Sequence, residues 1–254
     1  MTIFLMLVRK MVKDSDFYRR ISKIGLKKRW NKEHSKVRIN NKLSKEKIAI
    51  NAYLCGDGYI KVRKDRNSVI HHEIGIFPDD LDLAKRIVRL FQKEFKIKPK
   101  IRKDGGCFRI RVANKPACLH LLSLGKYKSK NWSIPKDLDK SLLKEWIKCF
   151  FDCEAYVNTS SKIIQVKSIN HKGLKSIKEM LKVLGIDSRL YGPYKPKLER
   201  HSSYSMINIP QEELTKYKKL IKFYHKEKVK KLNSILNMPG SHNGSAHIIF
   251  PKKN

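Results

Sequence analysis

The order of apolar and polar residues along the chain predicts helices and strands that alternate in a regular way. Ser44 is suited to cap a helix, and the apolar residues after it recur at helical spacing up to Asp57. Residues 59–63 then alternate between apolar and basic side chains, the pattern of a strand with one buried face. The following residues predict a strand, a helix, a hairpin and a short helix, at 69–77, 81–95, 99–102 with 108–112, and 116–122.

The same order of elements is predicted again after a linker at residues 125–135. A helix over 138–153 ends at Glu154, which lies 97 positions after Asp57. A strand region from Tyr156, a strand, a capped helix, a hairpin and a long basic helix follow, at 163–169, 171–184, 186–191 with 204–209, and 212–236. The sequence therefore predicts an α+β chain built from a duplicated unit of about 95 residues.

The duplication divides the chain into four predicted segments. The first repeat covers residues 44–135 and the second covers 136–236. A basic arm at 1–43 precedes the repeats, and a tail at 237–254 follows them. The arm has few apolar residues, so it is either a solvated segment or a short helical arm that lies on nucleic acid.

Two similar stretches end the first helix of each repeat. Residues 52–58 read AYLCGDG, and residues 149–155 read CFFDCEA. Taken alone, Asp57 is a common turn residue before glycine, and Glu154 is an ordinary carboxylate at a helix end. Because both acids occupy the same place in a duplicated unit, the pair predicts metal-binding carboxylates, the hard oxygen ligands that Mg²⁺ prefers. Asp152 is expected to face away from Glu154, because the two are only two positions apart on a helix.

The charge of the chain narrows the choice of partner. Its 254 residues contain 58 Lys and Arg against 23 Asp and Glu, a formal net charge of +35. Such an excess repels itself in the folded state and is typical of a protein whose partner is a polyanion. Nucleic acid is therefore expected first and a membrane surface second. A ribosomal-type protein would have a similar charge, so charge alone predicts no activity.

Basic and amide side chains occupy alternate positions of the predicted strands. A two-stranded ribbon can enter the major groove, where Arg and Gln pair with guanine and adenine edges and Lys meets phosphate. For any single residue a solvated basic face is an equally good interpretation, but the set favours DNA. The predicted DNA-binding residues are Lys61, Arg63, Arg102, Arg109, Arg111, Gln165, Lys167 and Arg189.

Cysteine usage and the N-terminal residues indicate the compartment. None of the five cysteines forms a C-x-x-C pair, so we expect small buried thiols in a reducing environment. The apolar residues 2–8 are too few to span a bilayer, and they lack the flanks of a signal peptide. The sequence therefore predicts a soluble intracellular protein.

The paired motif stretches, the repeated order of elements and the lysine-rich linker resemble the LAGLIDADG homing endonucleases in their single-chain form with two motifs. Gly56, Asp57 and Gly58 are similar to the last three positions of the family motif, and the second copy is similar to a variant that ends in Glu. Over residues 44–236 the resemblance implies two pseudo-symmetric αββαββα repeats. It further implies motif helices packed at the centre and two antiparallel sheets that form a DNA-binding saddle.

The resemblance also implies an activity. It implies an intron-encoded type of enzyme that cuts both strands of a specific DNA site with Mg²⁺, or Mn²⁺ as a substitute, using one acid per strand. By the same resemblance, the backbone carbonyls of Gly56 and Cys153 are further metal ligands, and Gln165 and Lys167 order water and balance charge. The implied partner is a long target in double-stranded DNA, bound by a monomer, with intron RNA as a further candidate.

Some positions depart from the family pattern, and other functions stay open. Ala155 stands where the family has Gly, and the middle glycine of the motif is Ala52 in one copy and Cys149 in the other. One alternative is a non-cleaving relative, either an intron RNA maturase or a DNA-binding regulator. Another is a basic structural RNA-binding protein, which needs neither the duplication nor the paired acids. Met1 and Asn254 show no intein splice junction, so a free-standing enzyme is expected.

Overall fold

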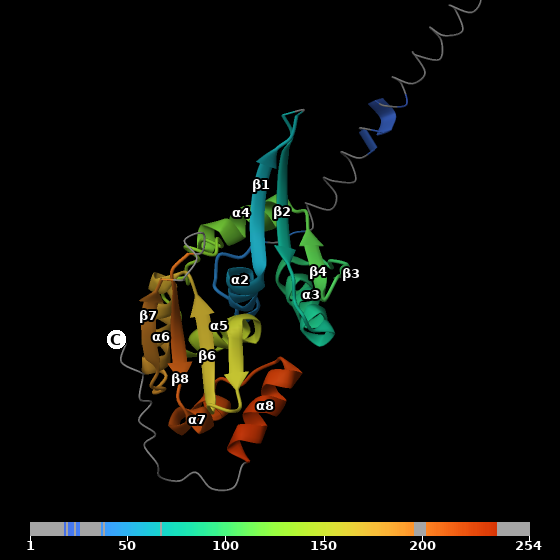
Figure 1. Ribbon diagram of the computed structural model, residues 1–254. Helices are drawn as coiled ribbons and strands as arrows, with labels where there is room; N and C mark the ends of the chain where they lie inside the picture. Colours follow the sequence, from blue (N-terminus) through green and yellow to red (C-terminus); the bar gives the residue numbers. More distant parts are fainter. Residues whose placement is uncertain are drawn as a thin grey trace, which may run out of the picture. The chain divides into compact units, whose positions relative to one another are not determined.

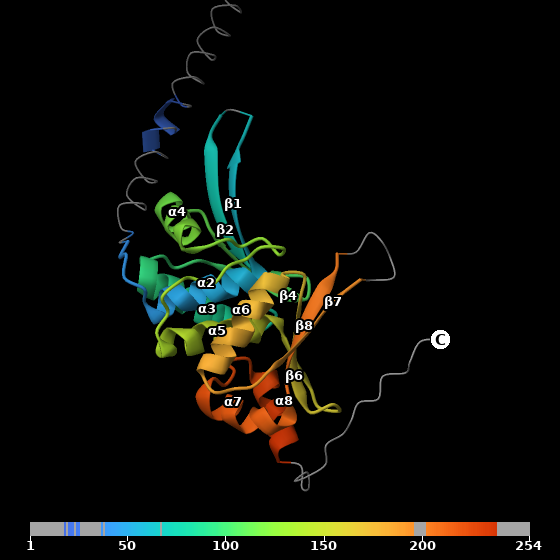
Figure 2. The same ribbon diagram turned by 90° about the vertical axis from the view of Figure 1, so that its left-hand side faces the viewer.

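The computed structural model describes residues 18, 20–22, 24–25, 37, 39–66, 68–195 and 202–237 (Figures 1 and 2). Most of the predicted arm and nearly all of the predicted tail lie outside the described residues. Contacts divide the chain into two compact units. The first runs to Lys128 and includes Trp132–Lys136, and the second contains Ser129–Asn131 and resumes at Asp137.

The first unit holds one four-stranded antiparallel sheet and three helices. Its strands lie in the order β1-β2-β4-β3, and α2, α3 and α4 contact them (Figure 1). The elements in chain order are α2 (Lys45–Asp57), β1 (Gly58–Lys64), β2 (Ile70–Ile76), α3 (Leu81–Phe95), β3 (Ile101–Asp104), β4 (Cys107–Val112) and α4 (Lys115–Leu124).

The second unit repeats this topology with strand order β5-β6-β8-β7 (Figure 2). Its elements are α5 (Lys140–Glu154), β5 (Ala155–Asn158), β6 (Ile163–Ser168), α6 (His171–Val183), β7 (Arg189–Tyr194), β8 (Tyr204–Ile209), the 3₁₀ turn η1 (Gln211–Glu213), α7 (Leu214–Leu220) and α8 (Lys226–Leu236). The predicted α+β chain of two αββαββα repeats is confirmed.

Polar caps begin the helices where the sequence pattern changes. In five helices the residue before the first turn accepts a hydrogen bond from a backbone N–H three positions on, which satisfies a donor that the helix leaves unpaired. These caps are Ser44, Asp80, Asn114, Asp139 and Asn170. The helix predicted over 81–95 is found with the same bounds.

The helix α2 is buried on every face, since each residue from Lys47 to Cys55 is buried. The charge of Lys47 is satisfied inside the unit. Its ammonium donates to the carbonyl of Asn40 and, at 2.7 Å, to that of Lys42, and it lies 3.3 Å from a carboxylate oxygen of Glu94. A buried ion is tolerated only when it is paired and hydrogen-bonded in this way, so these contacts fix the start of α2.

The single helix predicted over 212–236 is wrong. The segment forms η1, α7 and α8, and the helix breaks after Leu220. Lys222 adopts the left-handed conformation with φ of 69°, and the backbone N–H groups of Tyr224 and His225 donate to the carboxylate of Asp152. The strand predicted from Ile186 begins later, at Arg189. None of the helices within the described ranges has the length and apolar composition needed to cross a bilayer.

Candidate metal-binding helix ends and basic sheet faces

Asp57 is the last residue of α2, and its side chain is partly buried. Its backbone carbonyl accepts a hydrogen bond of 2.9 Å from the N–H of Phe77, which joins the helix end to the end of β2. Gly58 follows in an extended conformation. A Cβ at Gly58 would lie 2.7 Å from the Cα of Leu54 and 3.1 Å from the carbonyl oxygen of Gly75. The close approach of these two backbones therefore requires glycine after the acid.

Glu154 is the last residue of α5 and is also partly buried. Ala155 follows in an extended conformation, and its N–H donates to the carbonyl of Phe151. The methyl group of Ala155 is buried, with only 4% of the residue exposed. The second repeat therefore accepts alanine at the position where the first requires glycine. In both repeats the residue that follows the acid has an extended backbone.

The C-terminal end of α5 is held by an ammonium group from α8. Lys228 Nζ donates to the backbone carbonyls of Phe151, Asp152 and Cys153, at 3.1, 2.5 and 3.0 Å. Helix C-terminal carbonyls lack intrahelical donors, and a cation there also opposes the partial negative charge of the helix end. The carbonyl of Cys153, predicted as a metal ligand, thus accepts a hydrogen bond from Lys228.

Asp152 lies in the interior of the second unit, whereas Glu154 is only partly buried. It is fully buried, and its carboxylate accepts N–H bonds from Tyr224 at 2.8 Å and His225 at 3.0 Å. Burial raises the pKa of Asp152 to about 6, although the two N–H groups and the charge of Lys228 pull it down. The carboxylate fastens the start of α8 to the end of α5.

The five predicted DNA-binding residues of the first repeat lie on one face of its sheet. The register pairs Lys61 with Glu73, Arg63 with His71, and Arg102 with Arg109, and residues paired across a ladder share a face. Arg111, two positions after Arg109 on β4, lies on that face as well. The apolar residues of the opposite face, such as Ile74, Ile76, Ile110 and Val112, are buried.

A polar cluster of Tyr59, Glu73 and Arg111 crosses this face, and Tyr59 stands two positions after Asp57. The Tyr59 hydroxyl and the Arg111 guanidinium both donate to the carboxylate of Glu73. The ring of Tyr59 lies over Gly75, where an added Cβ would come within 2.3 Å of it. Partial burial raises the pKa of Glu73, but the hydrogen bonds and positive charges outweigh it, so the net pKa is below its ordinary value.

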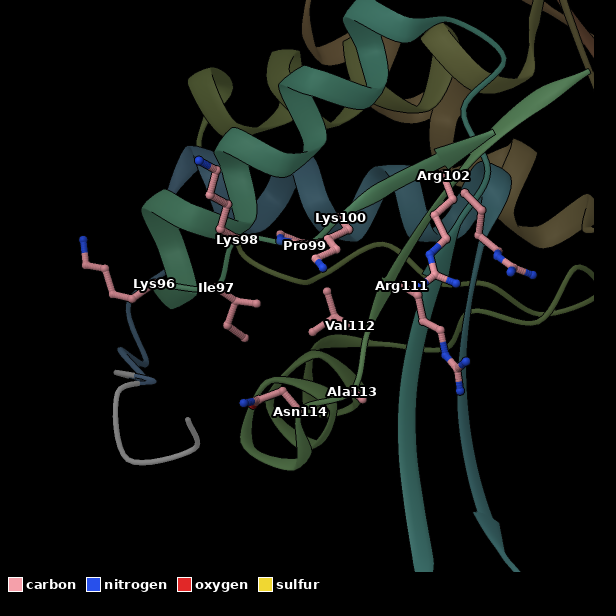
Figure 3. Close-up of a pocket in the computed structure, with 11 residues that line it drawn as sticks. Lys96, Ile97, Lys98, Pro99, Lys100, Arg102, Arg111, Val112, Ala113 and Asn114 are labelled. Carbon is pink, nitrogen blue, oxygen red and sulfur yellow. The ribbon is translucent and has the colours of Figure 1, made fainter. Parts of the chain in front are cut away.

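A basic groove of about 590 Å³ runs beside β3 and β4 (Figure 3). Three lysines of the α3–β3 connection, Lys96, Lys98 and Lys100, line it together with Arg102, Arg109 and Arg111. Its apolar floor includes Val112. A second hollow, of about 610 Å³, is lined by Tyr59, Lys61, Arg63, Glu73 and Arg111. Arg111 lines both hollows, so they form one basic surface.

The predicted residues of the second repeat also share one face. The register places Gln165 opposite Tyr156 on one side and Asn208 on the other, and Arg189 lies opposite Asn208. Gln165 donates to the side-chain oxygen of Asn208 at 3.0 Å. Lys167 Nζ lies 3.7 Å from the centre of the Tyr204 ring, and Arg189 pairs with Glu212 at 3.3 Å.

Each repeat offers a divalent metal one helix-end carboxylate and nearby backbone carbonyls. Within the described residues no group of three or more His, Cys, Asp and Glu gathers to hold an ion. Such a set does not build a closed cage. It fits a hard cation that keeps several waters and is completed by a substrate phosphate, as Mg²⁺ commonly is.

The groove lysines and Lys228 are not among the predicted site residues. The sequence does contain a pattern that could have indicated the groove. Lysine alternates with an apolar residue in the run Lys96-Ile97-Lys98-Pro99-Lys100. Lys228 is one of many lysines in the last helices, and nothing in the local pattern distinguishes it. Only the tertiary contact with α5 does so.

A family model of known proteins matches part of the second repeat. Residues 141–222 match the family model of the LAGLIDADG-like domain, which runs from α5 past the end of α7. The second repeat is thus similar to a LAGLIDADG-like domain. The matched range falls in the second repeat, and the first repeat has the same strand order.

Solved structures of homing endonucleases share the LAGLIDADG fold of this chain. I-DmoI in complex with DNA and Ca matches with a TM-score of 0.57 and 16% identity, covering 75% of this chain and 97% of the other. I-DmoI with DNA and Mn matches at 0.55 and 17%, covering 70% and 96%. I-WcaI bound to its DNA recognition sequence matches at 0.51 and 15%, covering 78% and 91%.

The chain is also similar to a curated protein. That protein is a probable translation initiation factor IF-2 from Methanocaldococcus jannaschii, 29% identical over 234 residues. The match covers 83% of this chain but only 20% of the relative, so the chain spans about a fifth of that protein's length.

Proposed function

We propose that this protein is a site-specific endonuclease that cuts both strands of DNA with a divalent metal. The observation that carries the proposal is the placement of Asp57 and Glu154. Each acid is the last residue of the first helix of its repeat and stands directly before the first strand. A duplicated unit with one such acid per copy supports one acid for each DNA strand.

Asp57 and Glu154 are proposed as the metal-binding carboxylates, with the backbone carbonyls of Gly56 and Cys153 beside them. A bound Mg²⁺, or Mn²⁺ in its place, would supply charge to the scissile phosphate and lower the pKa of an attacking water. The neighbouring I-DmoI structures were solved with Mn or Ca, which supports a divalent ion. The role of the two acids is to fix the position of the ion.

Gln165 and Lys167 are proposed to act next to the acid of the second repeat. Ala155, the residue after Glu154, pairs with Val166 in the β5–β6 ladder, and Lys167 is the next residue along β6. Its ammonium can balance charge at the phosphate, and the Gln165 amide can order water. Lys167 lies over the ring of Tyr204, an attachment that keeps it on the outward face.

The two sheet faces are proposed to bind double-stranded DNA. In the first repeat the face carries five basic residues and continues into the groove lined by Lys96, Lys98 and Lys100 (Figure 3). Arginine forks suit guanine edges, and lysines in a flanking groove suit phosphates. The structural neighbours I-DmoI and I-WcaI were solved with DNA, which supports this partner. Because the chain has two such sheets, one chain could contact a long DNA target.

Cleavage of a plasmid tests the proposal. The full chain is incubated with Mg²⁺ and a plasmid that carries the insertion site of its own genetic element, and linear product is measured. We expect Asp57→Asn and Glu154→Gln to lower the rate of double-strand cleavage by about 10³-fold or more, with binding retained. Glu179→Gln, an exposed acid on α6, is the matched control and should cut normally.

A non-cleaving maturase or regulator gives a different result. Tight binding to DNA or RNA without any cut, in Mg²⁺ or Mn²⁺, would refute the endonuclease proposal. Salt dependence tests the binding surface separately. Because many phosphates are neutralised, DNA affinity should fall by about 10³-fold or more between 50 and 200 mM salt. A weak dependence would contradict the proposed basic faces.

A further inference from the structure

Gly75 interrupts the side chains on the outward face of the first sheet. The register places Gly75 of β2 between Tyr59 of β1 and Arg111 of β4, so these three residues form one row across the strands. Residues paired across a ladder share a face of the sheet. The Tyr59 ring covers Gly75, and an added Cβ would come within 2.3 Å of that ring. The middle strand therefore contributes no side chain to this row.

Glu73 connects the two ends of the row. It stands two positions before Gly75 on β2, so its side chain lies on the same outward face. Its Oε1 accepts from the Tyr59 hydroxyl, and its Oε2 accepts from Nη2 of Arg111. The Glu73 side chain is 15% exposed, whereas that of Arg111 is 56% exposed. A part-buried carboxylate thus holds one edge of an exposed guanidinium.

The exposed part of Arg111 is available to a ligand. Arg111 lines both hollows of the basic surface, including the groove beside β3 and β4 (Figure 3). Glu73 accepts from Nη2, so other N–H donors of the planar guanidinium remain for a base edge. Arginine pairs with guanine through two parallel N–H bonds to O6 and N7, which requires a defined orientation of the guanidinium.

A carboxylate on this face is unfavourable for DNA binding in general, because it repels phosphate. Asp104 also pairs with an arginine of the face, but its surroundings differ. It lies 3.3 Å from Arg109 at the end of β3, and both side chains are exposed. Glu73 is instead part-buried and is fixed by a second donor, the Tyr59 hydroxyl. The contact between Glu73 and Arg111 is therefore the one built to orient its arginine.

We propose that Glu73 is a positioning residue for base recognition, which holds the Arg111 guanidinium in the orientation that pairs with guanine in the major groove. The inference rests on the proposed function, and it concerns sequence preference rather than cleavage. The contact restricts a long side chain before DNA binds, so less conformational entropy is lost when the guanine contact forms. Glu73 thus lowers the affinity for DNA in general and raises the preference for one base pair.

Selection from a library of randomised DNA duplexes tests the inference. The full chain is used in EDTA, so that no strand is cut. Arg111→Met identifies the base pair that Arg111 reads, since it should lose guanine preference at one position. The parent protein should bind the selected duplex about tenfold more tightly than the same duplex with A·T there. Glu73→Ala should reduce this ratio to about twofold and leave the preferences at other positions unchanged.

Asp104→Ala is the matched control, because it removes one carboxylate from the same sheet face and changes the net charge equally. It should leave the guanine preference at the base pair read by Arg111 unchanged. Adding Glu73→Ala to Arg111→Met tests whether Glu73 acts through the arginine. If it does, the double variant and Arg111→Met should discriminate between the two duplexes equally, within about twofold.

The outcomes separate the inference from the proposed function. If Arg111→Met or Glu73→Ala keeps the full guanine preference, the inference is wrong, while sequence-selective binding would still support the endonuclease. A cytosine preference that Glu73→Ala removes and Arg111→Met keeps would also overturn it, because Glu73 would then accept from cytosine N4 itself. If the parent protein selects no sequence, both the inference and the site-specific function fail.

Circular dichroism checks the folding of each variant. Should Glu73→Ala not fold, Glu73→Gln decides the matter by the same comparison, because it keeps one acceptor oxygen without the charge. The guanine preference of Glu73→Gln should be about threefold lower than that of the parent protein. A preference equal to that of the parent protein would overturn the inference.

Discussion

The two repeats have the same strand order but differ in what surrounds the acid at the end of the first helix. In the first repeat, Gly58 follows the acid because the backbones of Leu54 and Gly75 approach too closely for a side chain. In the second repeat, Ala155 fits, and Lys228 donates to the carbonyls of the helix end. The backbone of the two helix ends is thus held by different contacts.

The outward faces of the two sheets also differ in the contacts that their side chains make. Tyr59 and Tyr156 each stand two positions after their acid, and across the ladder they face Gly75 and Gln165, respectively. Glycine lets the Tyr59 ring lie flat over β2, with its hydroxyl bonded to Glu73. Gln165 instead bonds to Asn208, and 56% of Tyr156 is exposed. The inward apolar positions keep the topology of the repeats, and the outward polar positions carry their difference.

Asp152→Ala should give the largest effect on stability, because it tests the attachment of α8, a helix without a counterpart among the described elements of the first repeat. The change leaves the buried N–H of His225 and the part-buried N–H of Tyr224 without their acceptor. We expect a loss of about 2–4 kcal/mol in the free energy of unfolding, measured by urea denaturation at pH 7. Glu179→Ala on the exposed face of α6 is the control. A loss below about 1 kcal/mol would mean that the carboxylate does not hold α8.

Exchanging the residues after the two acids should give a smaller and asymmetric effect. Gly58→Ala places a Cβ 2.7 Å from the Cα of Leu54 and should cost about 1–3 kcal/mol of unfolding free energy. Ala155→Gly removes one buried methyl group and adds backbone freedom, and it should cost about 1 kcal/mol. Thermal and urea unfolding of both variants measure the difference. Equal costs would show that the two helix ends do not differ as described.

The sequence predicts the parts of the fold that periodicity and capping determine. The helix after Asp80 has its predicted bounds, and the outward placement of Lys61, Arg109 and Lys167 follows from strand alternation. These features depend on neighbours in the sequence, so a local pattern is enough to find them. The helix-end acids were found because the pattern is duplicated.

The features that the sequence does not predict all depend on contacts between distant residues. Residues 212–236 have helical periodicity throughout, yet they do not form one helix. The helix α7 ends at Leu220 and Lys222 is left-handed, because Asp152, about 70 positions earlier, accepts the N–H groups of Tyr224 and His225. The place of Lys228 at the end of α5 follows from that break. A single charged residue among many lysines carries no local sign of such a role.

Removing the acidic partners of the arginines on the two outward sheet faces should have the smallest effect on the free energy of unfolding. Arg111 pairs with Glu73, whose side chain is 15% exposed, whereas Arg189 pairs with Glu212, where both side chains are 63% exposed. A part-buried pair with a second donor stabilises more than an exposed one. At pH 7, Glu73→Gln should therefore cost about 1 kcal/mol of unfolding free energy, and Glu212→Gln about 0.5 kcal/mol or less.

The pH dependence of stability tests whether the Arg111–Glu73 pair stabilises the first repeat through the charge of Glu73. The hydrogen bonds from Tyr59 and Arg111 outweigh burial and hold the pKa of Glu73 below its unperturbed value of 4.5. A depressed pKa means that the unfolded state binds more protons, so the stabilisation is present above pH 4.5 and is lost as the pH falls through the lower, folded-state value. Urea denaturation between pH 3 and 7 should show Glu73→Gln approaching the parent protein as the solution is acidified. A gap that stays constant over this range would show that Glu73 does not act through its charge, and the two faces would then differ only in packing.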